Sequence, residues 1–318
     1  MKFERRIRRA VSLIEVLIVV SISSVLVALL LPAVQKVRAA AKRLSCQSNM
    51  RQIAIATHNY ESTTGRLPPA FRHRRPDTQD PNIQWPLLIA PYLELDANSR
   101  MATEDLRKSQ DPFLPQPHRG VSLPLKAFSC PSDPRTAVPW EFTFFYTLAQ
   151  PQPKLMTVQL ALNSYLGNGG ALTKNRDGVI VADGSLSLIH IADGTSNTLM
   201  FGERPPAASL WMGWLYVGWG ATGPNGNGEL ASVIGVLDPN PLLIRFGSNG
   251  PCGPGPFPYR EPDLNAKPDC AMFQYWSLHG GGANFAFADG SVHFLTYSAN
   301  SILPALATRS GGEVAEIP

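Results

Sequence analysis

The 318 residues allow one large domain or two ordinary ones, with enough chain to bury a substantial core. Charged residues make up only 16% of the chain, against a globular norm of roughly 25%, and its 29 prolines and 26 glycines favour turns and short strands. The first ten residues carry five basic side chains and one glutamate, a balance equal to the net charge of +4. The rest of the chain is therefore neutral overall, which argues against a nucleic-acid partner.

Residues 11–31 form an apolar run in which Glu15 is the only charged side chain. A helix of this length spans about 30 Å, the thickness of the hydrocarbon core of a bilayer. The run is longer than the apolar part of a secretory signal, which has about 7–15 residues, and it ends at Pro32 without an A-x-A site. The basic residues before it predict a cytoplasmic amino terminus and an external remainder. We therefore expect a single-pass protein of the cytoplasmic (inner) membrane, with its main domain periplasmic or extracellular.

Residues 32–65 predict an amphipathic continuation of the same helix. Apolar and small side chains recur at helical spacing from Val34 to Tyr60, with basic and polar residues between them. Pro32 removes one backbone hydrogen bond, so we expect it to kink the helix rather than end it. Gly65 supplies the stop signal.

The amino-terminal residues resemble a prepilin-type cleavage and methylation signal: basic residues, a small residue, then "VSLIEVLIVV", with a proline near the outer end of the run. The usual signal has glycine before the cut and phenylalanine after it, where this chain has Ala10 and Val11. The resemblance implies that a prepilin peptidase cuts between these two residues and that the new amine of Val11 is methylated. It also implies that Glu15 meets the amino terminus of a neighbouring subunit during assembly.

The position of Glu15 supports such a role independently of the resemblance. An acidic residue at mid-bilayer costs roughly 3 kcal/mol on insertion scales, and residues of this kind are usually retained where they meet a partner. The alternative is that Glu15, which lies near the start of the run, reaches the lipid headgroups unaided.

Residues 66–318 are expected to form the exported domain, after a leader at 1–10, a membrane helix at 11–31 and the amphipathic continuation. Prolines in the stretch 67–139 predict loops with one short helix at "WPLLIAPYLELD". Residues 221–270 are rich in glycine, proline and asparagine and predict a long surface excursion.

Strand signals follow Asn163 in a stretch with three Asp-Gly pairs, of which we take the pair at 183–184 as a hairpin turn. Asp-Gly predicts a two-residue type I′ hairpin turn, which needs positive φ at both central residues. Val181 would then face Leu186 across the hairpin. The following "ADGTSNT" predicts a turn that leads into a strand through 199–201.

A further Asp-Gly pair at 289–290 predicts another two-residue hairpin turn. Phe287 would face Val292 and Phe285 would face Phe294, which gives one aromatic-aliphatic face for packing on the long helix. His293 would lie on the opposite face. A short helix is expected to start near residue 301 and to end before residue 311.

The stretch "WMGWLYVGWG" carries three tryptophans, Trp211, Trp214 and Trp219. One interpretation is an exposed platform on which a carbohydrate stacks. The other is a half-buried aromatic strand, which we favour because aromatic side chains contribute mostly through burial.

His279, nine residues and then Asp289 and Gly290 match the H-x9-DG signature of a family that is associated with prepilin-type processing and whose broader domain has no assigned function (DUF1559). Segments along nearly the whole chain fit the family in order: "QIAIATHNY", "FSCPSDP", "ADGTSNTLMFGE", "GGANFAFADGSVHFL" and "ALATRSGGE". The expected fold is α+β and pilin-like, with the long amino-terminal helix packed on an antiparallel sheet among long Pro/Gly-rich loops. The family carries no established biochemical activity, so the resemblance implies no cofactor.

His279 and Asp289 could be proposed as a catalytic dyad or as two metal ligands. We favour structural roles, in which Asp289 shapes its turn and His279 hydrogen-bonds backbone. The sequence has no G-x-S-x-G, H-E-x-x-H, Walker or C-x-x-C pattern, and no loop has EF-hand spacing for calcium.

The four cysteines are an even number in a chain that we place outside the reducing cytosol, so we expect disulfides. Three pairings are possible. We favour Cys252 with Cys270, which closes a short loop in flexible sequence, and Cys46 with Cys130. Zinc is disfavoured because no pair of cysteines has ligand spacing.

The sequence as a whole predicts a pilin-like or pseudopilin-like structural protein rather than an enzyme. Its partners would be a prepilin peptidase, the membrane, and copies of itself or related subunits bound through the helix. One alternative is a surface adhesin or glycan-binding module, which requires the three tryptophans to be exposed. Another is an anchored hydrolase that uses His279 and Asp289.

Overall fold

The computed structural model describes residues 13–72, 83–108, 119–146, 154–182, 184–210, 213–216, 231–240, 250–313 and 315. The chain forms two units, residues 1–43 and residues 44–318, and each is described by itself. Helices combine with small antiparallel and mixed sheets, so the fold class is α+β, as the sequence predicts.

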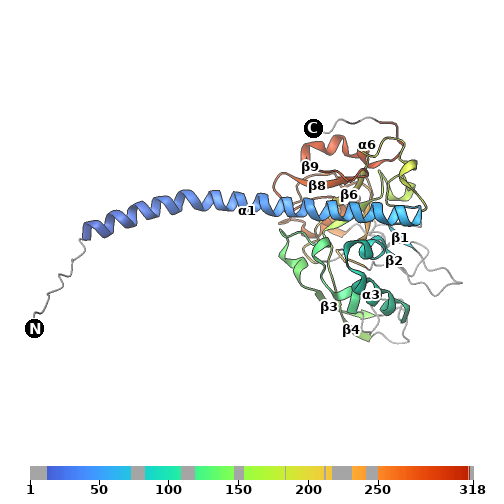
Figure 1. Cartoon of the computed structure of the whole chain (residues 1–318), viewed down its shortest axis with the longest axis horizontal. Coiled ribbons are helices and arrows are strands. Elements are labelled where there is room, and N and C mark those ends of the chain that lie inside the picture. The colour runs from blue at the N-terminus through green and yellow to red at the C-terminus, as the bar shows by residue number, and fades with distance from the viewer. Residues whose placement is uncertain are drawn as a thin grey trace, which may run out of the picture. The chain divides into compact units, whose positions relative to one another are not determined.

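The first element, α1, is a helix of 52 residues from Leu13 to Thr64 that continues through Pro32 (Figure 1). It ends where the sequence predicts. Gly65 has a φ of 72°, and its N–H donates to the carbonyl of Glu61 at 2.7 Å. A glycine with positive φ after the last turn satisfies one of the final carbonyls and lets the chain leave the helix. The long helix is therefore confirmed over the described residues.

The part of α1 that belongs to the second unit has one buried side. Its buried residues recur at intervals of three or four positions, as expected of an amphipathic helix. They are Cys46, Met50, Ile53, Ala54, Ala56 and Thr57.

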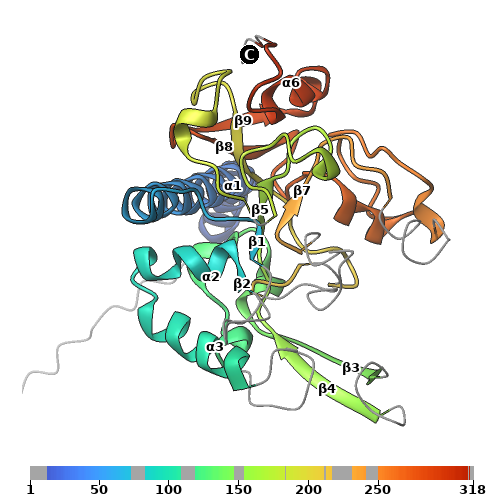
Figure 2. The same cartoon turned by 90° about the vertical axis from the view of Figure 1, so that its right-hand side faces the viewer.

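A five-stranded sheet, in the order β7-β5-β6-β8-β9, holds the second unit together (Figure 2). β5 pairs with β7 in parallel, and the other neighbouring strands are antiparallel. The strands are β5 (Tyr165–Asn168), β6 (Leu199–Glu203), β7 (Val233–Ile234), β8 (Gly282–Phe287) and β9 (Val292–Thr296). β6 is the strand predicted after "ADGTSNT".

The two faces of this sheet bury different hydrophobic clusters. Ala286 belongs to the cluster that contains Met50 of α1, whereas Phe285 and Phe287 belong to the cluster that contains Leu303 of α6 (Leu303–Ala307). Successive residues of a strand point to opposite faces, so β8 places small side chains toward α1 and phenylalanines toward α6. Both views show β8 and β9 between these two helices (Figures 1 and 2).

The register of the β8–β9 hairpin differs by one residue from the sequence prediction. Phe285 pairs with His293, and Asn284 pairs with Phe294. Phe285 and Phe287 belong to the cluster of α6, so the expectation that they face α1 is wrong. His293 pairs with Phe285, so the expectation that it lies on the face opposite the two phenylalanines is also wrong. The imidazole of His293 instead meets the ring of Phe287 edge-on, at a centroid distance of 5.3 Å.

The turn of this hairpin explains the shift. Gly290 has a positive φ of 86°, but Asp289 does not, so the turn is not type I′. The N–H of Gly290 donates to the carbonyl of Phe287 at 3.0 Å, and the N–H of Phe287 donates to the carbonyl of Ser291 at 2.9 Å. Asp289 Oδ1 also accepts from the N–H of Ser291 at 2.8 Å. The side chain of Asp289 thus stabilises a wider turn, which adds one residue to the loop.

Residues 67–139, which were expected to be mostly loop, contain more regular structure than predicted. The helix at "WPLLIAPYLELD" is confirmed as α2 and η1, but α3 is absent from the prediction. The elements are β1 (Phe71–Arg72), β2 (Ile83–Gln84), α2 (Trp85–Ile89), η1 (Ala90–Leu93), α3 (Asp96–Lys108), α4 (Arg119–Ser122), and the 3₁₀ turns η2 (Lys126–Phe128) and η3 (Pro134–Ala137).

α3 was not predicted from the sequence because its buried side consists mostly of polar and small residues. Asn98 donates from Nδ2 to the carbonyl of Gly120 at 3.1 Å, and Asp105 Oδ2 accepts from the N–H of Arg119 at 2.8 Å. These hydrogen bonds, rather than an apolar stripe, account for the burial of the helix. The prediction of loops with a single short helix over 67–139 therefore missed α3.

The hairpin expected at residues 183–184 is absent from the described residues, and Asp183 itself lies outside them. The flanking backbone bonds to other segments. The N–H of Ile180 donates to the carbonyl of Asn168 at 3.0 Å, and the carbonyl of Val181 accepts from the N–H of Ala70 at 3.0 Å. The carbonyl of Leu186 likewise accepts from Leu67 at 2.7 Å. The two sides of the expected hairpin thus bond to the chain after α1 and to β5.

A separate two-stranded ribbon, β3 (Trp140–Tyr146) and β4 (Lys154–Leu160), was not predicted (Figure 2). Thr143 and Thr157 pair across it, and their hydroxyls lie 2.7 Å apart. The remaining short elements are η4 (Thr173–Asn175), η5 (Leu188–His190), η7 (Gly250–Cys252), η8 (Pro268–Phe273) and η9 (Tyr297–Ser301). The short helix expected to start near residue 301 and to end before residue 311 is present as α6, and η9 precedes it.

Candidate functional site

The apolar part of α1 is a candidate membrane anchor. Among the described residues it is the one helix whose length and composition suit a bilayer, and none of its most apolar stretch is buried. Every large apolar side chain from Leu13 to Leu31 is more than half exposed. The hydroxyls of Ser21 and Ser24 donate to carbonyls three residues earlier, both at 2.8 Å. These two hydroxyls are thus satisfied inside the helix, as a lipid environment requires.

Glu15 lies in the first described turn of α1, and its side chain is exposed. A carboxylate in the first turn interacts favourably with the helix dipole. Ala10 and Val11, the predicted cleavage and methylation residues, lie outside the described residues.

A buried cluster of four side chains lies within the second unit, beside the buried side of α1. Its members are Cys46, Cys130, Glu203 and His279, which we call the His279 cluster; their ligand-type atoms all lie within 4.8 Å of one another. Cys46 and Cys130 form a disulfide, as predicted. His279 Nε2 lies 3.6 Å from Cys130 Sγ and 3.4 Å from Glu203 Oε1.

Each member of the cluster comes from a different part of the chain. Cys46 is on the buried side of α1, Cys130 follows η2, and Glu203 ends β6. His279 precedes β8, and Ser277 Oγ accepts from its N–H at 2.9 Å. The cluster therefore exists only once the helix, the loop and two strands have packed together.

Hydrogen bonds fix one oxygen of Glu203 but leave the other facing the histidine. Glu203 Oε2 accepts from the backbone N–H of Asn284 at 2.7 Å and from its Nδ2 at 3.1 Å. Glu203 Oε1 is fully buried and receives no hydrogen bond from a described residue; its contact with His279 Nε2 is an ion pair only if the imidazole is protonated. The other ring nitrogen, Nδ1, lies 3.5 Å from Ser132 Oγ.

The negative charge of Glu203 also affects the pKa of Tyr165, which is fully buried beside the cluster. Burial raises the pKa of the Tyr165 phenol well above its usual value, and the negative charge of Glu203 raises this pKa further. The phenol therefore stays neutral and acts only as a hydrogen-bonding group, 3.5 Å from the carbonyl of Cys46.

The structure does not bring His279 and Asp289 together. Asp289 is exposed at its turn and bonds the backbone of Ser291, while the His279 ring is buried against Glu203, Cys130 and Ser132. The described contacts therefore give Asp289 and Gly290 turn roles. The imidazole of His279 contacts side chains rather than the backbone that the sequence reasoning favoured.

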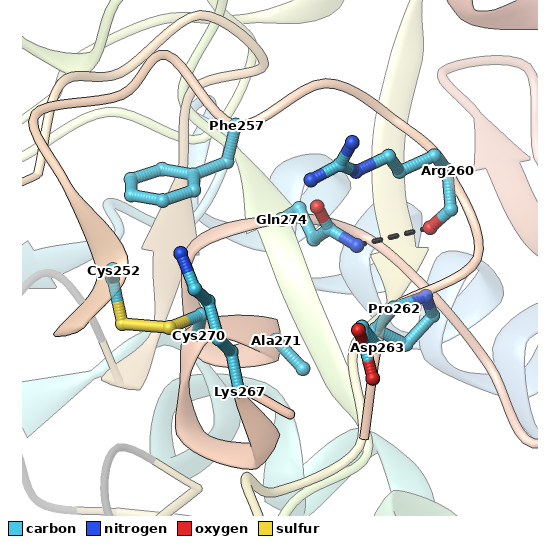
Figure 3. Close-up of a pocket in the computed structure, with 9 residues that line it drawn as sticks. All are labelled: Cys252, Phe257, Arg260, Pro262, Asp263, Lys267, Cys270, Ala271 and Gln274. Atoms are coloured by element: carbon cyan, nitrogen blue, oxygen red, sulfur yellow. Dashed lines mark hydrogen bonds between the residues drawn. A yellow bond between two sulfur atoms is a disulfide. The ribbon is translucent and has the colours of Figure 1, made fainter. Parts of the chain in front are cut away.

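The second predicted disulfide, Cys252 with Cys270, is also present. It borders a small cavity of about 80 Å³, which Figure 3 shows with Arg260, Asp263 and Lys267 around it. Ligand pockets usually have volumes of about 300–1,000 Å³, and both signs of charge line this one. The cavity therefore suits bound water rather than an organic ligand.

The exposed tryptophan platform is not formed as the binding-module alternative requires. Trp214 is completely buried, and its indole stacks with the ring of Phe142 at 6.1 Å and with that of Trp140 at 6.2 Å. The half-buried aromatic interpretation is the better one for Trp214. Trp211 and Trp219 lie outside the described residues.

Sequence reasoning missed Glu203, Ser132 and Asn284 as neighbours of His279. A signal for Glu203 was available, because it is a charged residue that ends an apolar strand in "LMFGE". Such a residue is buried only with polar partners. Nothing in the sequence pairs it with His279.

Comparison with known protein families gives a match over residues 35–301 to a family described as "Protein of unknown function (DUF1559)". The match covers well over half of the chain. No curated protein and no solved structure matches the chain significantly.

Proposed function

The chain belongs to the DUF1559 family, and we propose that it is a pilin-like structural protein anchored in the membrane by α1. The observation that carries the proposal is the division of one continuous helix into two kinds of surface. Residues 13–31 expose almost only apolar side chains, whereas residues 44–64 supply part of the core of a folded unit. Such a helix combines an anchor and a scaffold in one element.

The proposed processing follows from the resemblance of residues 5–20 to a prepilin signal. A prepilin-type peptidase cuts between Ala10 and Val11, and the amine of Val11 is methylated. Removal of the leader takes away the basic side chains that hold the amino terminus at the cytoplasmic face.

Glu15 is proposed as the residue that aligns subunits. Glu15 follows Val11 by four positions in the sequence, so the amine of a neighbouring subunit can reach its carboxylate where the helices pack side by side. Two opposite charges that meet in lipid offset part of the insertion cost that each would have alone. The role in this proposal is structural, with no enzymatic step.

The covalent link between α1 and the folded unit supports this role. The Cys46–Cys130 disulfide joins the helix to the loop after η2. A force on the helix is therefore carried into the domain even where non-covalent contacts yield. Two disulfides also suit a domain that resides outside the reducing cytosol.

Mass spectrometry of the mature amino terminus tests the proposal. The chain should be produced in membranes with and without an active prepilin peptidase. We expect a terminus at methyl-Val11 with the peptidase and an intact leader without it. An intact leader in both cases would show a plain membrane anchor and overturn the proposed processing.

The assembly step is tested separately with Glu15→Ala and the isosteric Glu15→Gln. We expect both variants to be cleaved at Ala10 but to lose subunit cross-linking through the helix. Glu61→Gln, a change of the same kind near the other end of α1, is the matched control and should leave cross-linking intact. Unchanged cross-linking of both Glu15 variants would contradict the role of this carboxylate.

A further inference from the structure

We infer that the His279 cluster binds one Zn²⁺ ion when the Cys46–Cys130 disulfide is reduced. The four residues then supply two thiolates, one imidazole nitrogen and one carboxylate oxygen. This set of donors is one that tetrahedral zinc accepts in proteins. The inference concerns the folded unit and does not depend on the pilin-like function.

The distances within the cluster match a zinc tetrahedron. Zinc bonds of about 2.3 Å to sulfur and about 2.0–2.2 Å to nitrogen and oxygen place neighbouring ligand atoms roughly 3.3–3.8 Å apart. His279 Nε2 lies 3.6 Å from Cys130 Sγ and 3.4 Å from Glu203 Oε1. Two edges of the tetrahedron are thus already formed, and cleavage of the disulfide lets the two sulfurs separate to complete it.

The free oxygen of Glu203 independently indicates a missing cation. The side chain is 1% exposed, and Oε1 receives no hydrogen bond from the described residues. A buried carboxylate oxygen normally meets donors or a positive charge. Glu203 Oε1 faces His279 Nε2, the nitrogen that also lies next to Cys130 Sγ. A metal ion bound between these three atoms would therefore satisfy Oε1.

The surroundings of the cluster resemble the outer shell of a metal site. His279 Nδ1 lies 3.5 Å from Ser132 Oγ, which can accept its proton and so leave Nε2 free to bind metal. Glu203 Oε2 is held by Asn284, and Gln47 Nε2 in turn donates to Asn284 Oδ1 at 2.9 Å. Both ligand side chains are therefore oriented by partners that do not themselves bind the ion.

The chemistry of the donors selects the metal. Calcium and magnesium take oxygen ligands, whereas two sulfurs and an imidazole suit zinc. All four residues are buried, so the site is closed and structural, with no position for a reacting substrate. Its consequence is that zinc replaces the disulfide in joining α1 to Cys130 under reducing conditions.

The exchange of disulfide for metal balances as follows. A dithiol reductant gives two electrons and two protons to the Cys46–Cys130 bond and becomes a disulfide itself, which leaves two thiols on the protein. Binding of Zn²⁺ releases those two protons to solvent, and both sulfurs bind as thiolates. A disulfide oxidant reverses the sequence: it takes two electrons from the two thiolates and, with two protons from solvent, becomes two thiols, while the Cys46–Cys130 bond re-forms and Zn²⁺ leaves.

The test uses the full chain in detergent micelles with Cys252→Ala and Cys270→Ala, so that only the cluster holds cysteines. The protein is reduced with a dithiol in the presence of zinc, freed of excess reagent, and its metal content is measured. We expect one zinc per chain in the reduced protein and none in the oxidised protein. Cobalt should give the charge-transfer and visible bands of a tetrahedral thiolate site.

Variants show whether all four residues take part. We expect His279→Ala and Glu203→Gln to weaken zinc binding by more than about 100-fold, because loss of outer-shell partners alone costs about 10–100-fold. Ser132→Ala should fall in that smaller range, and His293→Ala, an exposed histidine outside the cluster, should bind like the parent. Near-ultraviolet circular dichroism of the oxidised variants checks that each one folds.

Two results would overturn the inference. The first is a reduced protein that takes up no more zinc than the oxidised protein, including one that unfolds on reduction although zinc is present. The second is zinc uptake that His279→Ala and Glu203→Gln leave unchanged, which would mean that the thiols bind metal without the rest of the cluster.

Discussion

Gln47 on α1 donates a hydrogen bond from Nε2 to Oδ1 of Asn284 on β8 at 2.9 Å, although the two residues are 237 positions apart. Asn284 is fully buried, and its Nδ2 donates a hydrogen bond to Glu203 Oε2 at 3.1 Å. A series of hydrogen bonds thus links α1 through Asn284 of β8 to Glu203 of the His279 cluster. Polar groups at a buried junction fix one alignment, because any slip of α1 along the sheet would leave them unpaired.

Asn284→Ala should lower the free energy of unfolding by about 2–3 kcal/mol, since it removes the donor to Glu203 and leaves Gln47 without its acceptor. Urea unfolding of the folded unit in detergent, followed by tryptophan fluorescence, measures this loss. Gln47→Ala is the control and should cost about 1 kcal/mol or less, because Gln47 is only half-buried. Equal losses for the two variants would show that the bond to Glu203 contributes little.

Removal of the Cys46–Cys130 disulfide should destabilise the protein more than removal of Cys252–Cys270. The two bonds join residues 84 and 18 positions apart, and loop-closure entropy gives about 4–5 kcal/mol for the longer loop and about 3 kcal/mol for the shorter. Paired cysteine-to-alanine variants, unfolded in urea with a metal chelator present, measure the difference. A larger loss for the shorter loop would mean that strain or residual structure, rather than chain entropy, decides these values.

Ala286→Leu should destabilise the protein by about 1–3 kcal/mol, because the larger side chain has to fit between β8 and the buried side of α1. Val292, which pairs with Ala286 on β9, is only partly buried, so Val292→Leu is a control that should be nearly neutral. Thermal unfolding of both variants, monitored by circular dichroism, provides the comparison. A neutral Ala286→Leu would contradict the close packing of α1 on this face.

Alkaline pH should destabilise the folded unit through its buried tyrosines. Burial raises the pKa of Tyr165, Tyr216 and Tyr275 well above the usual value, and that of Tyr297 to about 12. The unfolded chain loses these protons near pH 10 while the folded chain keeps them. The stability they contribute is therefore complete below about pH 10, and each fully buried phenol reduces it by up to about 1.4 kcal/mol per pH unit above that.

Urea unfolding at a series of pH values checks this sign and slope. We expect phenolate absorbance from the buried tyrosines to appear together with the loss of near-ultraviolet circular dichroism. Tyr275→Phe should reduce the slope by about one proton, although it also removes a hydrogen bond of 2.9 Å to the carbonyl of Gly167. Full tyrosine titration near pH 10 in a protein that stays folded would refute the prediction.

Features with local causes could be predicted from the sequence. The apolar run and helical periodicity specify α1, Gly65 ends it through its own positive φ, and β6 follows the turn in "ADGTSNT". An even number of cysteines in a chain expected to be exported led us to predict the two disulfides that the structure contains.

Features that depend on distant partners could not be predicted. The turn at Asp289 is one residue wider than its Asp-Gly pair suggests, so His293 rather than Phe294 pairs with Phe285. Phe285 also packs in the cluster of α6 rather than against α1. Similarly, α3 buries Asn98 and Asp105 against α4, whose backbone supplies their hydrogen bonds, so no apolar stripe marks it. In both places, tertiary contacts with distant segments override the structure that local sequence preferences predict.

The sequence by itself determined that the chain has one long apolar-to-amphipathic helix, a carboxylate near its start and a domain that ends in an Asp-Gly hairpin. Only the tertiary structure decided that His279 meets Glu203, Cys46 and Cys130, and that Asp289 lies apart from it. The physical reason is sequence distance. Helix periodicity and turn chemistry act over a few residues, whereas the cluster joins four segments whose approach is set by burial of the whole core.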